Sequence, residues 1–178
     1  MQISIDGFVA RPQGELDWMT WNMDEKILGF INELTDASGT ILMGRKMTDG
    51  FINYWESVKP ESPEYTFAKK MIDIPKVVFT NTMTESPWVN TTLAHDLAKD
   101  IKDLKEKDGK DIIAYGGAGF VTNLIKENLI DDSYLFVNPI AIGEGLTIFG
   151  DVGGNKELRL VDSTPYECGI IVNHYQRA

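Results

Sequence analysis

The chain has 178 residues, of which 43% are hydrophobic and 25% are charged, proportions typical of a soluble globular domain. A chain of this length can bury its apolar residues in one core, so a single domain over residues 1–178 is expected. Seventeen Lys and Arg against 27 Asp and Glu give a net charge of −10, which argues against nucleic acid and anionic membranes as partners. A few local cations and backbone N–H groups can still hold a small anion.

Cysteine content and hydropathy indicate the cellular compartment. Cys168 is the only cysteine, which excludes an intramolecular disulfide and a multi-cysteine zinc site. The first ten residues lack the pattern of a signal peptide, and no apolar run reaches the ~18 residues of a membrane helix. We therefore expect a cytoplasmic protein.

The first half of the chain alternates strand-favouring and helix-favouring segments. An opening strand is predicted within residues 2–10, bending or ending at Asp6-Gly7. Asn22 and Glu25 resemble a capping box, and the apolar residues that follow at helical spacing predict a helix over 24–35. Further strands are predicted at 40–43 and 76–80, and between them helices from 45 toward 54 and over 64–72.

The second half continues this alternation and closes with a hairpin. A short extended piece is predicted at 88–89, before a helix with Leu97, Ile101 and Leu104 on one face. A strand at 111–115 leads into a helix, and another strand follows at 133–138. The last two strands, near 157–166 and 170–175, are joined by a tight turn at Cys168-Gly169. The sequence therefore predicts an α/β fold with a mostly parallel central sheet flanked by helices and an antiparallel C-terminal hairpin.

Two strand-to-helix junctions are candidate anion sites, because ligands of open α/β sheets bind at the carboxyl ends of the strands. At the first junction, Gly44 permits close approach of a ligand, while Arg45 and Lys46 supply charge suited to the 2′-phosphate of NADPH. The alternative is that Gly44 is only a turn residue and that both cations are solvated.

The second junction is the glycine-rich segment at residues 116–119. Gly116, Gly117 and Gly119 lie between an apolar strand and a helix, the arrangement that cradles a pyrophosphate on backbone N–H groups. The spacing is neither G-x-G-x-x-G nor that of a P-loop. A packing turn therefore explains the glycines nearly as well.

The loop after the first strand contains candidate catalytic residues, namely Asp6, Asp17 and Trp18, with Trp21 nearby. A carboxylate and an aromatic plate could orient a heteroaromatic ring. A carboxyl group beside Trp18 could also have a raised pKa and deliver a proton through water. The alternative is a set of loop acids with Trp residues that cover the core.

The sequence lacks the motifs of zinc enzymes and of serine hydrolases. His95 and His174 lie far apart in the sequence and outside any zinc-binding pattern, so no metal is expected. A G-x-S-x-G nucleophile elbow is also absent.

Five motifs occur in an order that resembles a known family. They are Ser4-Ile5-Asp6-Gly7-Phe8-Val9-Ala10, Leu42-Met43-Gly44-Arg45-Lys46-Met47-Thr48, Tyr115-Gly116-Gly117-Ala118-Gly119, Leu129-Ile130-Asp131-Asp132, and Pro139-Ile140-Ala141-Ile142-Gly143-Glu144-Gly145 before Ile148-Phe149. Together they cover nearly the whole chain. They resemble the dihydrofolate reductase-like family, in the branch of riboflavin-biosynthesis deaminase–reductases and small stand-alone reductases.

The resemblance implies hydride transfer from NADPH to a pterin-like, pyrimidine-like or other conjugated heterocycle, and a homodimer. It also implies that the double glycine, which commonly carries a cis peptide, meets the pyrophosphate, and that residues 80–81 lie near the adenosine phosphate. The cofactor-binding residues expected from it are Gly44, Arg45, Lys46, Thr48, Thr80, Asn81, Tyr115, Gly116, Gly117, Ala118, Gly119 and Phe120.

Two positions depart from the family pattern. Dihydrofolate reductases have an acidic residue on the first helix, where this chain has Lys26, and riboflavin-pathway reductases often have Glu where this chain has Tyr115. The sequence therefore predicts an NADPH-dependent reductase of the 5-amino-6-(5-phosphoribosylamino)uracil reductase or dihydrofolate reductase type, with a small-molecule substrate left unassigned. A non-catalytic dinucleotide-binding module acting through a protein partner is the alternative, and flavin binding is a third.

Overall fold

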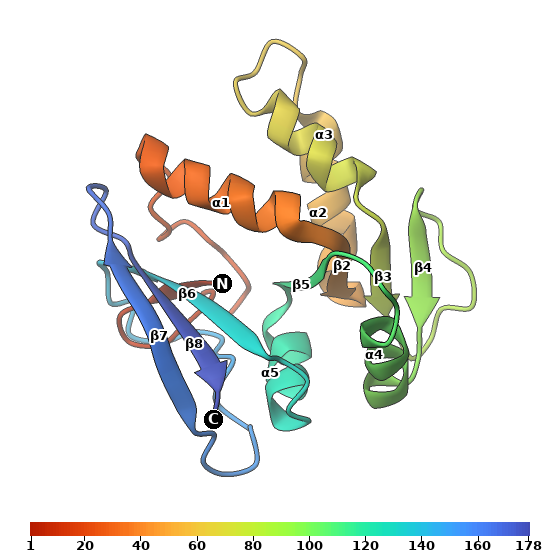
Figure 1. The fold of residues 1–178 in the computed structure, drawn as a ribbon. Helices are drawn as coiled ribbons and strands as arrows, with labels where there is room; N and C mark the ends of the chain where they lie inside the picture. The colour runs from red at the N-terminus through yellow and green to blue at the C-terminus, as the bar shows by residue number, and fades with distance from the viewer. The chain divides into compact units, whose positions relative to one another are not determined.

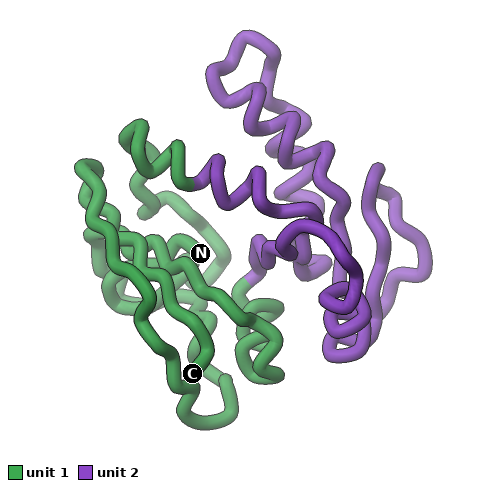
Figure 2. The backbone as a smooth tube through the Cα atoms, viewed as in Figure 1, with its two compact units in different colours: residues 1–30, 118–178 green, residues 31–117 purple.

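The computed structural model describes residues 1–178, and contacts within it divide the chain into two compact units (Figure 2). Unit 1 comprises residues 1–30 and 118–178, and unit 2 comprises residues 31–117. Each unit contains one four-stranded sheet (Figure 1). The predicted α/β class, with parallel strands flanked by helices and an antiparallel hairpin at the C-terminus, is confirmed.

Unit 2 holds the all-parallel sheet, in the order β4-β3-β2-β5. Its elements are β2 (Ser38–Gly44), α2 (Arg45–Ser57), α3 (Tyr65–Asp73), β3 (Lys76–Phe79), β4 (Thr91–Ala94), α4 (Leu97–Lys105) and β5 (Asp111–Gly116). Ile41 and Met43 of β2 are completely buried and pack with Val78 of β3, while Phe51 of α2 and Met71 of α3 close the same cluster. The continuous apolar run of β2 therefore forms a strand because neighbouring strands and covering helices remove it from water.

Unit 1 holds the mixed sheet, in the order β1-β6-β8-β7. Its elements are β1 (Gln2–Ser4), the first part of α1 (Glu25–Ala37), α5 (Ala118–Lys126), β6 (Asp132–Asn138), β7 (Leu158–Pro165) and β8 (Ile171–Arg177). β1 pairs parallel with β6, whereas β8 lies antiparallel to both β6 and β7. Gly169 has a φ of 89°, which the turn between β7 and β8 requires and which glycine adopts without steric cost. The predicted hairpin turn is confirmed.

Local details correct several expectations. The opening strand ends at Ser4, before the Asp6-Gly7 bend. Asp24, and not Asn22, caps α1: its Oδ1 accepts hydrogen bonds from the N–H groups of Lys26 (3.0 Å) and Ile27 (3.1 Å). Strand β4 occupies residues that the sequence placed ahead of α4 as a connection. No peptide bond is cis, which corrects the expectation for Gly116-Gly117. None of the helices combines the length and apolar character needed to cross a membrane.

Lys76 is a buried cation at the start of β3. Its Nζ donates hydrogen bonds to the carbonyl oxygens of Ile72 and Ile74, both at 2.7 Å, where α3 ends. Only 2% of the residue is exposed, and this burial lowers the pKa of its ammonium group to about 8. The charge therefore stabilises the last carbonyls of α3 while being desolvated itself.

This lowered pKa predicts how stability depends on pH. Between pH 8 and the ordinary lysine pKa of about 10.4, the unfolded chain holds a proton that the folded chain has released, so raising the pH stabilises the fold. In urea titrations from pH 7 to 10, the free energy of unfolding of the natural protein should rise relative to that of Lys76→Met. Lys69→Met, which changes an exposed lysine of α3, is the control and should show no such pH-dependent difference. A constant difference between the natural protein and Lys76→Met would contradict the lowered pKa.

Candidate functional site

The carboxyl edge of the unit 2 sheet collects most of the residues expected to bind cofactor. The chain adds β3 and β4 on one side of β2 and then returns to place β5 on the other, so the strand order reverses at β2. Such a switch point is where open α/β sheets bind ligands. In register, Gly44 pairs with Phe79, and Met43 pairs with Gly116. The ends of β2, β3 and β5 therefore lie side by side.

Helix α2 begins at this edge. Gly44 has an extended conformation, and no side chain caps the helix at its N-terminus. A 13-residue helix has unpaired backbone N–H groups and a partial positive charge at its first turn. This end of α2 can therefore accept an anionic group.

Arg45 is held at the first turn of α2 by three side chains. Its Nη1 donates to Asp49 Oδ2 (3.1 Å), its Nε lies 2.9 Å from Met83 Sδ, and its guanidinium lies 5.5 Å from the centre of the Trp88 ring. Trp88 Nε1 in turn donates to Asp49 Oδ1 at 3.1 Å. Lys46 differs, because it is exposed and makes no ion pair. One positioned cation and one unpaired cation thus stand at this helix end.

The double glycine ends β5 and precedes α5. Gly116 and Gly117 have φ values of 140° and 23°, a region that side chains disfavour. A Cβ on Gly117 would meet no atom within 4 Å, so open space lies beside its backbone. The Gly117 N–H donates to the thioether Sδ of Met47 at 2.8 Å, and a thioether is a weak acceptor. A phosphate oxygen would be a stronger acceptor for the same N–H group.

Three of the expected cofactor residues make contacts within unit 2. Thr48 is completely buried, and its hydroxyl donates to the Gly44 carbonyl at 3.3 Å. Thr80 Oγ1 accepts the N–H groups of Thr82 (3.2 Å) and Met83 (3.3 Å) and so shapes the turn after β3. Tyr115 packs edge-on against Phe51 with ring centres 4.9 Å apart, and burial raises the pKa of its hydroxyl to about 12. At the tip of the turn after β3, Asn81 is exposed.

The remaining expected residues belong to α5. Ala118 and Gly119 form its first turn, and Phe120 packs beside the core cluster of unit 1 that includes Ile3 and Val121. Gly119 is exposed, with open space where a side chain would stand.

Asp6 organises the carboxyl edge of the unit 1 sheet. It accepts hydrogen bonds from Ser4 Oγ (2.6 Å) and from the backbone N–H groups of Ile142 (3.0 Å) and Gly143 (2.8 Å). These bonds, that of Ser4 foremost, hold the pKa of the Asp6 carboxyl below its usual value. Asp6 therefore ties the loop after β1 to the loop after β6, two of the five motifs noted in the sequence.

Asp17 and Trp18 do not form the expected proton-donating pair. Arg11 Nε donates to Asp17 Oδ1 at 2.7 Å, and this hydrogen bond is the main reason that the pKa of the carboxyl is lowered. The raised pKa expected for a carboxyl group beside Trp18 is therefore wrong for both Asp6 and Asp17. Trp18 is buried, and its Nε1 has no hydrogen-bond partner in the protein. A buried N–H without a partner is uncommon and leaves a donor for a water or a ligand.

Sequence reasoning missed the buried amide that positions this loop. Asn138 ends β6, accepts the Thr20 N–H on Oδ1 (2.9 Å) and donates to Gln2 Oε1 (2.7 Å) and to the Phe136 carbonyl (3.1 Å). Asparagine is seldom completely buried, so the one sequence signal was its position at the end of an apolar strand. Asp49, Met83 and Trp88, which hold Arg45, were missed as well.

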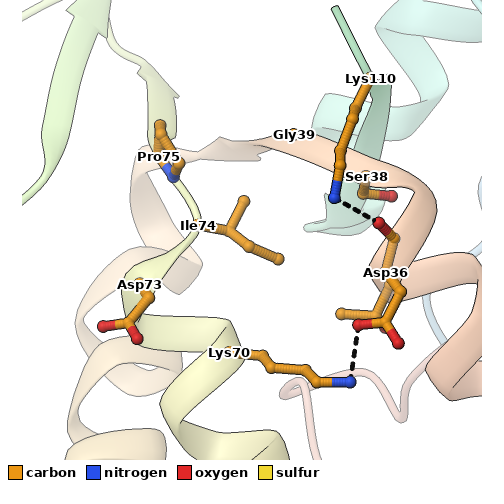
Figure 3. Close-up of a pocket in the computed structure, with 9 residues that line it drawn as sticks. Asp36, Ser38, Gly39, Lys70, Asp73, Ile74, Pro75 and Lys110 are labelled. Atoms are coloured by element: carbon orange, nitrogen blue, oxygen red, sulfur yellow. Dashed lines mark hydrogen bonds and ion pairs between the residues drawn. The ribbon is translucent and has the colours of Figure 1, made fainter.

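Another cavity lies at the amino edge of the unit 2 sheet. It has a volume of about 350 Å³ and is lined by charged side chains, including Asp36, Lys70 and Lys110 (Figure 3). Lys70 Nζ pairs with Asp36 Oδ1 at 2.6 Å, and Lys110 Nζ donates to the Asp36 carbonyl at 2.7 Å. This cavity lies at the edge where parallel sheets do not present helix N-termini. The carboxyl edge is the better candidate site.

Comparison with known proteins identifies the family of this chain. The model of the RibD C-terminal domain family matches residues 1–172. This chain belongs to the RibD C-terminal domain family. A curated relative, the uncharacterized protein YyaP of Bacillus subtilis, is 29% identical over 96% of this chain and 89% of its own length.

Solved structures extend the comparison. A Shewanella sp. PV-4 protein named for riboflavin biosynthesis is 26% identical with a TM-score of 0.76, covering 100% of this chain and 96% of the other. The dihydrofolate reductase of Enterococcus faecalis, solved with NADP(H), is 16% identical with a TM-score of 0.64, covering 99% and 92%. The second similarity establishes the fold alone. The dihydrofolate reductase-like fold expected from the sequence is confirmed, and the family supports a function of the reductase type.

Replacing Asp6 tests whether its hydrogen bonds hold the loop after β1 to the loop after β6. Because the folded carboxyl has a lowered pKa, it stabilises the protein above the ordinary Asp pKa of about 4, and this contribution is lost as the pH falls through the folded value. Asp6→Asn should therefore lower the melting temperature at pH 7, with a difference from the natural protein that shrinks toward pH 3. Amide hydrogen exchange at Ile142 and Gly143 should accelerate.

Glu144→Gln is the matched control, since it removes a carboxylate from the same loop without touching these hydrogen bonds. Unchanged exchange at residues 142–143 in Asp6→Asn would show that the hydrogen bonds do not hold the loop.

Proposed function

We propose that this protein is an NADPH-dependent reductase that transfers a hydride to a small heterocycle or to a related conjugated C=N or C=O group. The observation that carries the proposal is the uncapped N-terminus of α2 at the switch point of the unit 2 sheet, with Lys46 unpaired and Gly117 open beside it. Membership in the RibD C-terminal domain family and the shared fold with an NADP(H)-bound dihydrofolate reductase support the same conclusion.

The residues at this edge suit the phosphates of a dinucleotide. The first-turn N–H groups of α2 and the N–H of Gly117 are donors for phosphate oxygens. Arg45 and Lys46 supply the positive charge that a 2′-phosphate needs, and Asp49 with Trp88 keeps the guanidinium in place. When bound, NADPH supplies the hydride from its nicotinamide ring.

A proton must also reach the acceptor, and neither candidate carboxyl group suits that role. Asp6 and Asp17 both have lowered pKa values, so both are ionised near neutral pH. The reductase proposal therefore assigns the proton to water. Asp6 and Asn138 act by positioning the loops of unit 1, and Asp17 acts by pairing with Arg11.

The position of Lys26 bears on the substrate. It lies in the first turn of α1 and pairs with Glu167 at 3.4 Å. A carboxylate that grips a protonated pteridine is thus replaced here by a cation. We therefore favour a pyrimidine-like or other conjugated acceptor over a folate.

A dinucleotide-binding module without turnover is less well supported. Such a protein could fill the acceptor position with its own Trp18, Trp21 or Tyr115, of which Trp21 is the exposed one. Tyr115 instead packs against Phe51 within unit 2, and Trp18 is buried within unit 1. Both rings contribute to the packing of their own units.

Cofactor selectivity is the first test of this function. In calorimetric titrations, NADPH should bind more tightly than NADH, and Lys46→Gln should weaken NADPH binding by about tenfold while leaving NADH binding unchanged, because only NADPH carries the 2′-phosphate. Lys69→Gln removes an equal charge from the exposed face of α3 and should change neither affinity. Equal binding of NADPH and NADH by the natural protein would exclude the proposed role of Arg45 and Lys46.

Turnover is the second test. Purified protein with NADPH should be screened against pterin-like, pyrimidine-like and other conjugated acceptors by following NADPH oxidation. With any acceptor found, the kcat of Asp17→Asn should stay within about threefold of the natural value, because Asp17 is not the proton donor in this proposal. Removing a true general acid would lower kcat by ~100-fold or more. Glu15→Gln, in the same loop, is the control. A loss of ~100-fold in Asp17→Asn alone would restore Asp17 as the proton donor.

A further inference from the structure

Unit 1 contains a cavity that the proposed reductase function does not use. Its volume is about 250 Å³, and its lining residues come from α1, the strands β6, β7 and β8, and the turn after β7. They are Phe30, Tyr134, Asp162, Thr164, Tyr166, Val172 and His174. This volume is below the ~300–1,000 Å³ of sites for drug-sized ligands, so it suits a compound of one or two rings and excludes a dinucleotide.

Strand register explains how the floor of the cavity is built. Tyr134 of β6 pairs with His174 of β8, and His174 pairs with Asp162 of β7. Directly paired residues of antiparallel strands project from the same face, so these three side chains form one row. Phe30 of α1 packs edge-on against Tyr134, with ring centres 5.8 Å apart.

The next pair of residues on the same face, Asp132 and Gln176, fixes the row. His174 Nε2 lies 2.7 Å from Asp132 Oδ1, to which Gln176 Nε2 also donates at 3.0 Å. The His174 ring stacks on Tyr134 with centres 4.2 Å apart and planes 16° from parallel. When Nε2 donates its proton to Asp132, Nδ1 of His174 is left as an acceptor.

The turn after β7 is also fixed, and it carries Tyr166. Asp24 Oδ2 accepts the Cys168 N–H at 3.1 Å, and Lys26 pairs with Glu167 at 3.4 Å, so two contacts hold this turn against the start of α1. The aromatic sides contributed by Phe30 and Tyr166 are therefore part of a preformed cavity.

Asp162 is the one acidic residue that lines the cavity. No Lys or Arg lines it, and the cation on the neighbouring turn of α1, Lys26, already pairs with Glu167. Asp162 Oδ2 accepts the Thr164 hydroxyl at 2.6 Å, while Oδ1 makes no hydrogen bond within the protein. The cavity thus combines aromatic sides with an available carboxylate oxygen, a chemistry that suits a flat ring bearing a cationic or N–H donor group.

We propose that this cavity is a second ligand site, which binds a small planar aromatic or heteroaromatic amine or amidine. The ring lies against Phe30, Tyr134 and Tyr166, and the donor group binds Asp162. Tyr134 is four residues before Asn138 on β6, so the site lies about 13 Å back along the strand from the loops that Asp6 and Asn138 position.

Benzamidine and benzoate test the proposal, because they share size and shape but differ in charge. In calorimetric titrations of the full chain, benzamidine should bind and benzoate should not. Asp162→Asn, an isosteric change of an exposed residue, should weaken benzamidine binding by about tenfold. Asp151→Asn is the matched control, since it removes an exposed carboxylate of unit 1 that pairs with Lys126, and it should leave the affinity unchanged.

Two further measurements separate this site from the cofactor site. Benzamidine should bind equally well with saturating NADPH and in Lys46→Gln, and it should shift the ring NMR signals of His174. A failure of NADPH to bind would overturn the proposed function without affecting this result. Absence of benzamidine binding, equal binding of benzoate, full affinity in Asp162→Asn, or competition by NADPH would each overturn the second site.

Discussion

The burial of β2 is the constraint on which the candidate cofactor edge depends. Ile41 and Met43 are inaccessible to water, and this requires a strand on each side of β2 and helices over its faces. The chain meets the requirement by parallel pairing with both β3 and β5, which leaves the strand order reversed at β2. The reversal leaves backbone N–H groups at the start of α2 without neighbouring strands to cover them. The anion-binding geometry is therefore a consequence of how an apolar strand is removed from water.

Unit 1 uses polar groups for a related purpose. Its loops after β1 and β6 bury Val9, Trp18 and Ile148 in the core, and hydrogen-bonded polar side chains hold the same loops in addition. Asn138 satisfies its amide with partners on β1, on β6 and in the loop at Thr20, while Asp6 collects two backbone N–H groups from residues 142–143. Hydrogen bonds are directional, so these contacts fix loop conformations more sharply than apolar packing does. The lowered pKa of Asp6 results from this positioning and is incompatible with proton donation near neutral pH.

Periodicity predicted the elements well because most of them bury one continuous apolar stripe, as α2 does with Phe51 and β2 with Ile41. Strand β4 was missed because Thr91–Ala94 has little apolar character. Its hydrogen bonds to β3, which the sequence pattern does not indicate, make it a strand. The cap of α1 was misplaced by two residues, since Asn22 and Asp24 both have capping side chains and only the chain path decides between them. In the candidate site, Gly44, Gly117 and the adjacent cations were predictable, because glycine and basic residues follow directly after predicted apolar strands. The contacts of Asp6 with residues 142–143 were not, because they join segments more than 130 residues apart in sequence.

The two proposed ligand environments differ in the origin of their electrostatics, which bears on how a chain with a net charge of −10 can bind an anionic dinucleotide. At the carboxyl edge of unit 2, attraction comes from backbone N–H groups and two adjacent cations, whose fields act over a few ångströms. Distant acidic residues are screened by salt beyond roughly 8 Å, so they set solubility and approach and do not cancel the contacts at that edge. In the unit 1 cavity the carboxylate of Asp162 acts without a competing Lys or Arg among the lining residues, and the aromatic sides supply contact area that is insensitive to salt. Raising the ionic strength should therefore weaken binding of the dinucleotide more than binding of a planar amine, because the first depends on two cations that meet a multiply charged ligand and the second on one carboxylate beside a preformed apolar surface.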